Sequence, residues 1–243
     1  MRLFAKDLSL GQRFESVSAT FEPGTMTAIC GPNGAGKSSL LATLAGLHRP
    51  CSGTICLGEG DLANINPRHR ARAMGYLPQS AEVAWDVSVA SLVALGRLPH
   101  GDRGETAVAQ AIAQTDLAAL ARRPVSTLSG GEKARALLAR VLAGKPQWIL
   151  ADEPLAALDL AHQLAMLAHL RTCANKGAGI IIVLHDLALA MNHCDRVLVL
   201  DRGHCVADDA PEQALTAALI ARVWNVQGDW LGEPGSRAFA ARV

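Results

Sequence analysis

The stretch TMTAICGPNGAGKSSLLATLAGL, residues Thr25–Leu47, decides the fold of this chain. It predicts a strand over Thr25–Cys30 and a helix over Lys37–Leu47, joined by the loop GPNGAGKSS. This loop satisfies the pattern G-x-x-x-x-G-K-[ST] in the strand-to-helix context that the pattern requires. Its glycines let the backbone curl so that several N–H groups point inward, where they can hold phosphate oxygens. The sequence therefore predicts a phosphate-binding loop.

Every residue of this loop is a candidate nucleotide-binding residue. The Lys37 ammonium would bridge the β- and γ-phosphates, and the Ser38 hydroxyl would ligate Mg²⁺. The alternative is a glycine-rich turn that binds nothing, which the complete pattern in its proper context disfavours. The predicted nucleotide-binding residues of the loop are Gly31, Pro32, Asn33, Gly34, Ala35, Gly36, Lys37, Ser38 and Ser39.

A second motif, WILADEP at residues 148–154, supplies a partner for the magnesium ion. Its apolar strand ends in Asp152, which places that carboxylate at the carboxyl edge of the sheet, beside the phosphate loop. Asp152 would hold Mg²⁺ through its water shell, and Glu153 would polarise the water that attacks the γ-phosphate. The plainer alternative is a turn-capping aspartate followed by a solvated glutamate. Two further polar residues follow predicted strands, Gln79 after GYLP and His185 after IIIVL.

Strands and helices alternate along much of the chain. The predicted strands Trp148–Asp152, Gly179–His185 and Arg196–Asp201 are continuous apolar runs, which suit a parallel sheet that is buried on both faces. Predicted helices lie between them, over Asp159–Ala174 and Asp186–Cys194. This order indicates an α/β fold with a mainly parallel sheet.

The 243 residues are expected to form one domain that carries an insertion. Residues 87–144 are rich in Ala and Leu with helical spacing, which predicts a helical subdomain. Residues 1–21 alternate polar and apolar side chains and predict a small antiparallel β flank. The expected division is an α/β core over 1–80 and 145–210, a helical subdomain over 81–144, and a short helix with a polar tail over 211–243.

A second feature that could bind an anion lies in LSGGEKARALLARVLAG, residues 128–144. Ser129 followed by Glu132, just before an apolar run, is a capping-box helix start. The glycines Gly130 and Gly131 let a phosphate approach the exposed N–H groups, and the helix dipole favours an anion there. The chain therefore carries two predicted phosphate-binding features.

Composition disfavours several functional classes. Half of the residues are hydrophobic and 19% are charged, so a substantial core is expected. The net charge of +1 gives no field for nucleic acid, so no nucleic-acid partner is expected. No apolar run has the length of a membrane span and no signal-peptide pattern precedes the first strand, so a cytosolic protein is expected. The six cysteines form no CxxC pair, and reduced thiols are expected rather than a metal site at His48, Cys51 and Cys56.

Together these motifs resemble the ATP-binding cassette subunits of ABC transporters over about residues 20–210. GPNGAGKS, Gln79, LSGGE, ILADE, AALD at residues 156–159 and His185 occur here in the order of that family. The resemblance implies a P-loop NTPase fold with a RecA-like core. It also implies an ATPase that converts ATP and water to ADP and phosphate, with ATP and Mg²⁺ as cofactors.

The resemblance accounts for the presence of two phosphate-binding features. In that family two cassettes pair head to tail, and each ATP lies between the P-loop of one subunit and the LSGG of the other. This arrangement implies that Ser129, Gly130 and Gly131 bind the γ-phosphate of a nucleotide that a second copy of the chain holds. Asp159 resembles the aspartate that communicates across the dimer.

The resemblance also implies the catalytic roles. Glu153 corresponds to the catalytic base, and His185 to the residue that orients it and senses the γ-phosphate. Gln79 corresponds to a magnesium ligand that reports the nucleotide state to the helical subdomain. Many members stack adenine on an aromatic residue of the first strands, and Phe14 is the nearest candidate, about one residue short of the usual spacing. The implied metal-binding residues are Ser38, Gln79 and Asp152.

Two stretches point to a class of transporter. VALGRLPH at residues 93–100 and LHDLALAMNHCDRVLVLDRG at residues 184–203 resemble cassettes of importers for ferric siderophores, haem and cobalamin. The resemblance implies a peripheral subunit at the cytoplasmic face of the inner membrane. Its partners would be permease subunits, whose coupling helix would enter a groove of the helical subdomain, and indirectly a periplasmic binding protein.

Three alternatives to metal-chelate import remain open. The first is a soluble cassette ATPase of DNA repair or translation, although those proteins usually carry two cassettes or a long coiled-coil insertion. The second is an importer cassette for an unrelated small solute. The third is a cassette that binds ATP without hydrolysing it, against which the presence of both Glu153 and His185 argues.

Overall fold

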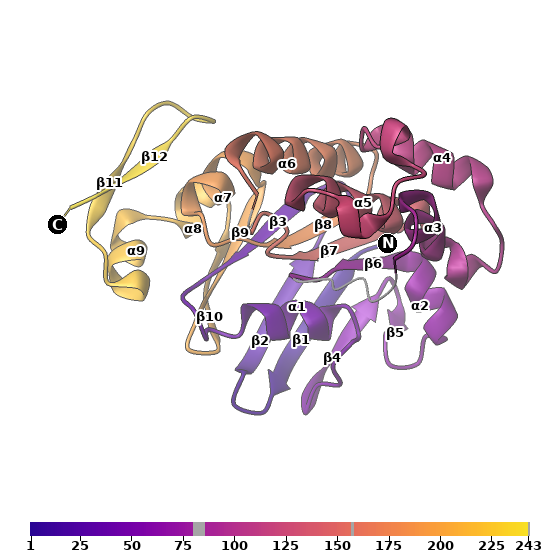
Figure 1. Cartoon of the computed structure of the whole chain (residues 1–243). Helices are drawn as coiled ribbons and strands as arrows, with labels where there is room; N and C mark the ends of the chain where they lie inside the picture. Colours follow the sequence, from indigo (N-terminus) through magenta and orange to yellow (C-terminus); the bar gives the residue numbers. More distant parts are fainter. Residues whose placement is uncertain (80–85, 157, 243) are drawn as a thin grey trace.

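The computed structural model describes residues 1–79, 86–156 and 158–242. Its larger sheet has the strand order β10-β9-β3-β8-β7-β6, and the strands run parallel except for β10, which pairs antiparallel with β9 (Figure 1). All residues of β3, β7 and β8 are buried, and for β7 and β8 this burial agrees with their continuous apolar runs. The strands are β3 (Met26–Cys30), β6 (Met74–Leu77), β7 (Trp148–Asp152), β8 (Gly179–Val183), β9 (Arg196–Asp201) and β10 (His204–Asp209).

A smaller antiparallel sheet forms the predicted flank. Its strand order is β2-β1-β4-β5. The helix α1 (Lys37–Leu44) packs between the two sheets, because its side chains Leu40, Leu41 and Leu44 share one buried core with both of them. This packing fixes the start of α1, and with it the phosphate loop, against the main sheet. The strands are β1 (Leu3–Leu10), β2 (Phe14–Phe21), β4 (Ser52–Leu57) and β5 (Gly60–Asp61).

Three helices cover the other face of the main sheet, namely α5 (Gly130–Ala143), α6 (Leu160–Asn175) and α7 (Leu187–His193). Aspartate side chains cap the last two. The Asp159 carboxylate accepts a hydrogen bond from the His162 amide at 2.9 Å, and Asp186 accepts from the Ala188 amide at 2.8 Å. The helices therefore begin one residue after the predicted starts, and each predicted first residue is the cap.

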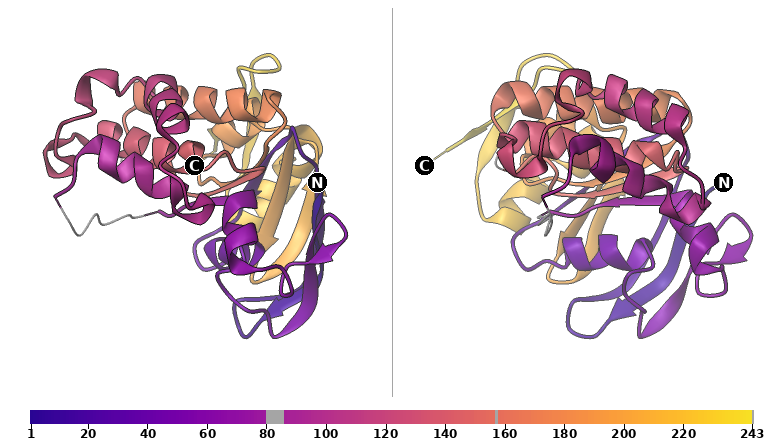
Figure 2. Two further views of the ribbon diagram at one scale, coloured as in Figure 1. Left: turned by 90° about the vertical axis from the view of Figure 1, so that its right-hand side faces the viewer. Right: turned by 45° about the vertical axis from the view of Figure 1, so that its right-hand side comes forward.

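The stretch from residue 87 to residue 144 is helical, as its composition predicts. Figure 2 shows it to one side of the two sheets. Besides α5, which ends this stretch, its elements are α3 (Val89–Ala94), the 3₁₀ helix η1 (Leu95–His100), α4 (Glu105–Gln114) and the 3₁₀ helices η2 (Ala118–Leu120) and η3 (Val125–Thr127).

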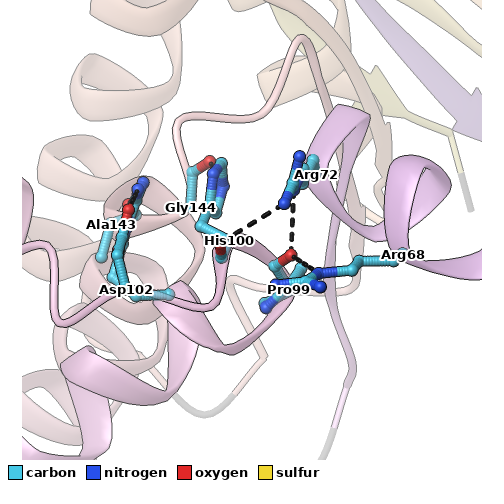
Figure 3. Close-up of polar contacts among 8 residues, drawn as sticks. Arg68, Arg72, Pro99, His100, Asp102, Ala143 and Gly144 are labelled. Atoms are coloured by element: carbon cyan, nitrogen blue, oxygen red, sulfur yellow. Dashed lines mark hydrogen bonds and ion pairs between the residues drawn. The ribbon is translucent and has the colours of Figure 1, made fainter.

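Hydrogen bonds join η1 to α2 (Pro67–Ala73), a helix of the α/β core (Figure 3). The guanidinium groups of Arg68 and Arg72 donate hydrogen bonds to the Pro99 carbonyl at 2.6 Å and 2.9 Å. On the other side, a ring nitrogen of His100 lies 2.9 Å from the Gly144 carbonyl at the end of α5. These contacts hold the helical segment against the α/β core at a fixed point.

The C-terminal segment differs from the prediction of a polar tail. After the helices α8 (Pro211–Ala214) and α9 (Ala217–Trp224), the strands β11 (Gly228–Leu231) and β12 (Ala238–Ala241) form an antiparallel hairpin. The rings of Trp230 and Phe239 pack edge to face at 5.3 Å, and the Asn192 side chain on α7 exchanges two hydrogen bonds of 2.8 Å with the Arg237 backbone. These tertiary contacts order a segment that lacks a strong strand pattern of its own.

Within the described residues, no helix is both long and apolar enough to cross a bilayer, and no three ligating side chains cluster as a metal site would require. The cysteines of the described chain are free thiols.

Candidate active site

The phosphate loop connects the end of β3 to the start of α1, as the sequence predicts. Gly36 precedes the helix with φ +97°, a left-handed conformation that favours glycine. A Cβ at this position would lie 2.4 Å from the Arg13 carbonyl oxygen. Because Gly36 has no side chain to cap α1, the amides of the first turn are left for an anion.

Lys37 lies at the first position of α1 and is buried, with 5% of its surface exposed. Its ammonium group donates hydrogen bonds to the carbonyl oxygens of Gly31 at 2.8 Å and Pro32 at 2.9 Å. Burial lowers the pKa of Lys37, and the carboxylates of Glu153 and Asp152 oppose this shift. The ammonium is therefore held inside the loop, close to two acidic groups.

Ser38 and Asp152, two of the three predicted metal-binding residues, are in direct contact. The Ser38 hydroxyl donates a hydrogen bond to Asp152 Oδ1 at 2.8 Å. Asp152 is 6% exposed, and burial raises its pKa, although the hydrogen bond from Ser38 opposes that shift. The sequence interpretation missed Tyr76 on β6, whose hydroxyl lies 3.5 Å from Asp152 Oδ2 and whose pKa is raised to about 12 by burial and this carboxylate.

The three predicted catalytic residues meet at one carboxylate. Gln79 donates a hydrogen bond to Glu153 Oε2 at 2.6 Å, and His185 Nε2 lies 2.5 Å from Glu153 Oε1. These residues follow β6, β7 and β8, which are neighbours in the main sheet. Glu153 has φ +47°, a conformation that is uncommon for residues other than glycine and recurs at functional sites.

A cavity of ≈ 200 Å³ connects the phosphate loop with Glu153. The adenine-stacking candidate Phe14 does not contribute to it, because its ring is buried in the core at 2% exposure. The sequence interpretation missed the neighbouring residue Arg13, which does line the cavity. The lining residues are Arg13, Asn33, Gly34, Gly36, Lys37, Ser38, Ser39 and Glu153.

The predicted capping box is present at the start of α5. The Glu132 carboxylate accepts a hydrogen bond from the Ser129 amide at 2.8 Å, and the Ser129 hydroxyl accepts one from the Glu132 amide at 3.3 Å. The predicted nucleotide-binding residues Ser129, Gly130, Gly131 and Asp159 are not among the described residues that line the cavity. The phosphate loop and the start of α5 therefore remain two separate candidate anion-binding features of one chain.

Comparison with known protein families shows which family this chain belongs to. A family model described as ABC transporter matches residues 14–156, which include the phosphate loop, Gln79, the start of α5 and Glu153. This chain belongs to the ABC transporter family. Membership of that family makes the chain an ATPase whose cassette binds ATP, in agreement with the site described above.

Named relatives resemble this ABC ATPase over most of its length. The hemin import ATP-binding protein HmuV of Nocardia farcinica is 42% identical over 225 residues, which cover 90% of this chain and 78% of that protein. The protein of the same name from Bordetella parapertussis is 37% identical over 251 residues, which cover 96% of each.

Solved structures share the fold. A chain of an ABC transporter described as of the metal-chelate type, in an inward-facing conformation, matches with a TM-score of 0.84 at 25% identity, over 99% of this chain and 97% of that one. The cassette MJ0796, solved as a dimer bound to ADP and Pi, matches with a TM-score of 0.75 at 22% identity, over 86% of this chain and 98% of that one.

The buried carboxylate of Asp152 predicts a conflict between stability and activity. Folding raises the pKa of Asp152, so its charged form costs stability, and this cost grows as pH rises from the ordinary aspartate pKa through the raised value. In Asp152→Asn the amide oxygen can keep the hydrogen bond from Ser38 while the charge is lost. Without nucleotide, we expect Asp152→Asn to have a higher melting temperature than the parent at about pH 8 and a smaller difference from it at about pH 5. The variant should also lose ATP turnover.

The exposed aspartate at the end of β10 provides the control, because Asp209→Asn removes a charge that is already solvated. Thermal unfolding of the three proteins at both pH values measures the effect. A melting temperature of Asp152→Asn at or below that of the parent at the higher pH would contradict the assignment.

Proposed function

We propose that this chain is the ATP-hydrolysing subunit that powers import of haem, an iron chelate, through a membrane permease. The observation that carries the catalytic part is the convergence of Gln79 and His185 on the Glu153 carboxylate beside the phosphate loop. Relatives named as hemin import proteins, at 42% and 37% identity, support haem over siderophore or cobalamin as the cargo.

The geometry supports a division of labour in ATP hydrolysis. The loop amides and the Lys37 ammonium bind the phosphates. Glu153, held from both sides, accepts the proton of the attacking water, while His185 fixes the orientation of that carboxylate. The products are ADP and phosphate.

Mg²⁺ fits the residues that are present. Ser38 and Asp152 bring a hydroxyl and a carboxylate together, and such oxygen ligands, completed by phosphates and water, suit this ion. Mg²⁺ would neutralise phosphate charge there, with Gln79 as the further ligand from the edge of the site. The loop residues from Gly31 to Ser39 form the rest of the ATP site.

The proposal includes a head-to-tail dimer that encloses ATP. The amides at the start of α5 do not line the cavity of their own chain among the described residues, so Ser129, Gly130 and Gly131 are available to the γ-phosphate of a partner copy. Asp159 would lie near the same interface. In the cell the dimer would sit at the cytoplasmic face of the inner membrane, bound to permease subunits and served by a periplasmic binding protein. We assign no role to nucleic acid, in keeping with the net charge of +1.

Arg13 is proposed to contact the nucleoside. It lies in the turn between β1 and β2, and the Glu15 amide ties this region to the Gly203 carbonyl beyond β9. In the main sheet β9 flanks β3 on one side, whereas β7, which carries Glu153, lies on the other side beyond β8. With Glu153 at the γ-phosphate, we infer from this strand order that Arg13 lies toward the nucleoside, where its planar guanidinium can stack on a base.

Replacing the base tests the catalytic assignment. Glu153→Gln keeps the side-chain shape but cannot accept a proton, so ATP turnover is expected to fall by about 10²-fold or more while ATP binding is retained. Steady-state hydrolysis and equilibrium binding of a fluorescent ATP analogue provide the two measurements. Near-normal turnover in the variant would remove Glu153 from the role of the base.

Removing the Arg13 guanidinium tests the nucleoside contact. Arg13→Ala is expected to raise the KM for ATP by about three- to tenfold with little change in kcat, because stacking contributes equally before and during the reaction. Arg49→Ala, which removes an exposed arginine beyond the end of α1, is the control. Equal KM values for the two variants would contradict the proposal.

The cargo is tested in a reconstituted complex. The chain is co-purified with its permease and binding protein, and the complex in vesicles is expected to take up haem when ATP is present on the side of the cassettes. The same complex built with Glu153→Gln should not. Preferential uptake of a ferric siderophore or cobalamin would replace haem with that chelate, and an active ATPase that binds no permease would favour the soluble classes.

A further inference from the structure

The imidazole of His162, on the first turn of α6, touches two elements of the proposed dimer interface. Its Nδ1 lies 2.6 Å from Asp159 Oδ1, the same oxygen that accepts the His162 backbone amide at 2.9 Å. The other edge of the ring lies against Gly131 in the first turn of α5, where an added Cβ would be 2.4 Å from His162 Cδ2 and 2.7 Å from Nε2. One side chain thus spans the gap between the two helix starts.

Helix capping alone does not need this arrangement. The Asp159 carboxylate caps α6 through the backbone amide of His162, and any residue at that position supplies such an amide. The ring adds a second bond to the same oxygen and a close contact that only glycine at position 131 allows. The His162 side chain is 38% exposed, so it adds little to the core.

We propose that His162 is a positioning residue for the ATP-bound dimer. It holds the Asp159 carboxylate at a fixed place relative to the amides of Gly130 and Gly131, so that both elements meet the neighbouring subunit's nucleotide as one rigid unit. This inference rests on the proposed head-to-tail dimer. Without the imidazole each element must be ordered separately when the dimer closes, and that ordering costs free energy.

The test measures ATP-dependent dimerisation in the Glu153→Gln background, where bound ATP persists. Sedimentation equilibrium with ATP and Mg²⁺ gives the dimer dissociation constant. His162→Ala is expected to raise it by about tenfold or more, because two contacting elements lose their common support. The affinity of the monomer for a fluorescent ATP analogue and the melting temperature should stay at the parental values.

Two further substitutions separate positioning from general structure. The His162→Asn amide can replace Nδ1 toward Asp159 and is expected to restore most of the dimer affinity, whereas the longer amide in His162→Gln is not. The control is His169→Ala, which removes another histidine of α6, and we expect the parental dissociation constant for it.

The outcomes distinguish the inference from the proposed function. If the Glu153→Gln parent stays monomeric with ATP, the proposed dimer itself fails. If the parent dimerises and His162→Ala dimerises within about twofold of it, or if the Asn and Gln variants behave alike, the positioning role is overturned. A loss of monomer ATP affinity and melting temperature in His162→Ala that matches its loss of dimerisation would likewise overturn it.

Discussion

The hydrogen bond from Ser38 to Asp152 joins the two halves of the candidate active site. It links the first turn of α1 to the last residue of β7, although the two residues are far apart in the sequence. The contact exists because α1 is packed between the two sheets and cannot rotate away from the sheet edge. This contact therefore also fixes the positions of the adjacent residues, Lys37 in the phosphate loop and Glu153 after β7.

Two ionisable groups of the site, Lys37 and Asp152, are buried away from water. Burial lowers the pKa of Lys37 and raises that of Asp152, so the same environment disfavours the charged form of each group. The two opposite charges partly offset one another, and a bound triphosphate with its counter-ion would supply further charges of both signs. The burial of these two ionisable groups is therefore a place where the protein gives up stability for function.

Much of this arrangement could be predicted from the sequence. The strands β7 and β8 are continuous apolar runs, and parallel strands bring their carboxyl ends to one edge, so His185 was expected in the sheet that carries Asp152 and Glu153. The strand β4 was not predicted, because its first half is exposed and it forms by pairing with β1. The C-terminal hairpin is held by the two hydrogen bonds between the Asn192 side chain and the Arg237 backbone. Contacts between residues so far apart in the chain leave no pattern in the local sequence. Arg13 could not be found because its role follows from the turn that presses against Gly36.

The position of Glu153 matters beyond the proton transfer proposed for it. Of its two partners, His185 belongs to the end of the central strand β8, whereas Gln79 stands at the point where the chain leaves the sheet for the helical segment. If Gln79 moved away, the Glu153 carboxylate would keep only its contact with His185. The position of the Glu153 carboxylate therefore depends on two parts of the chain at once, the main sheet and the start of the helical segment.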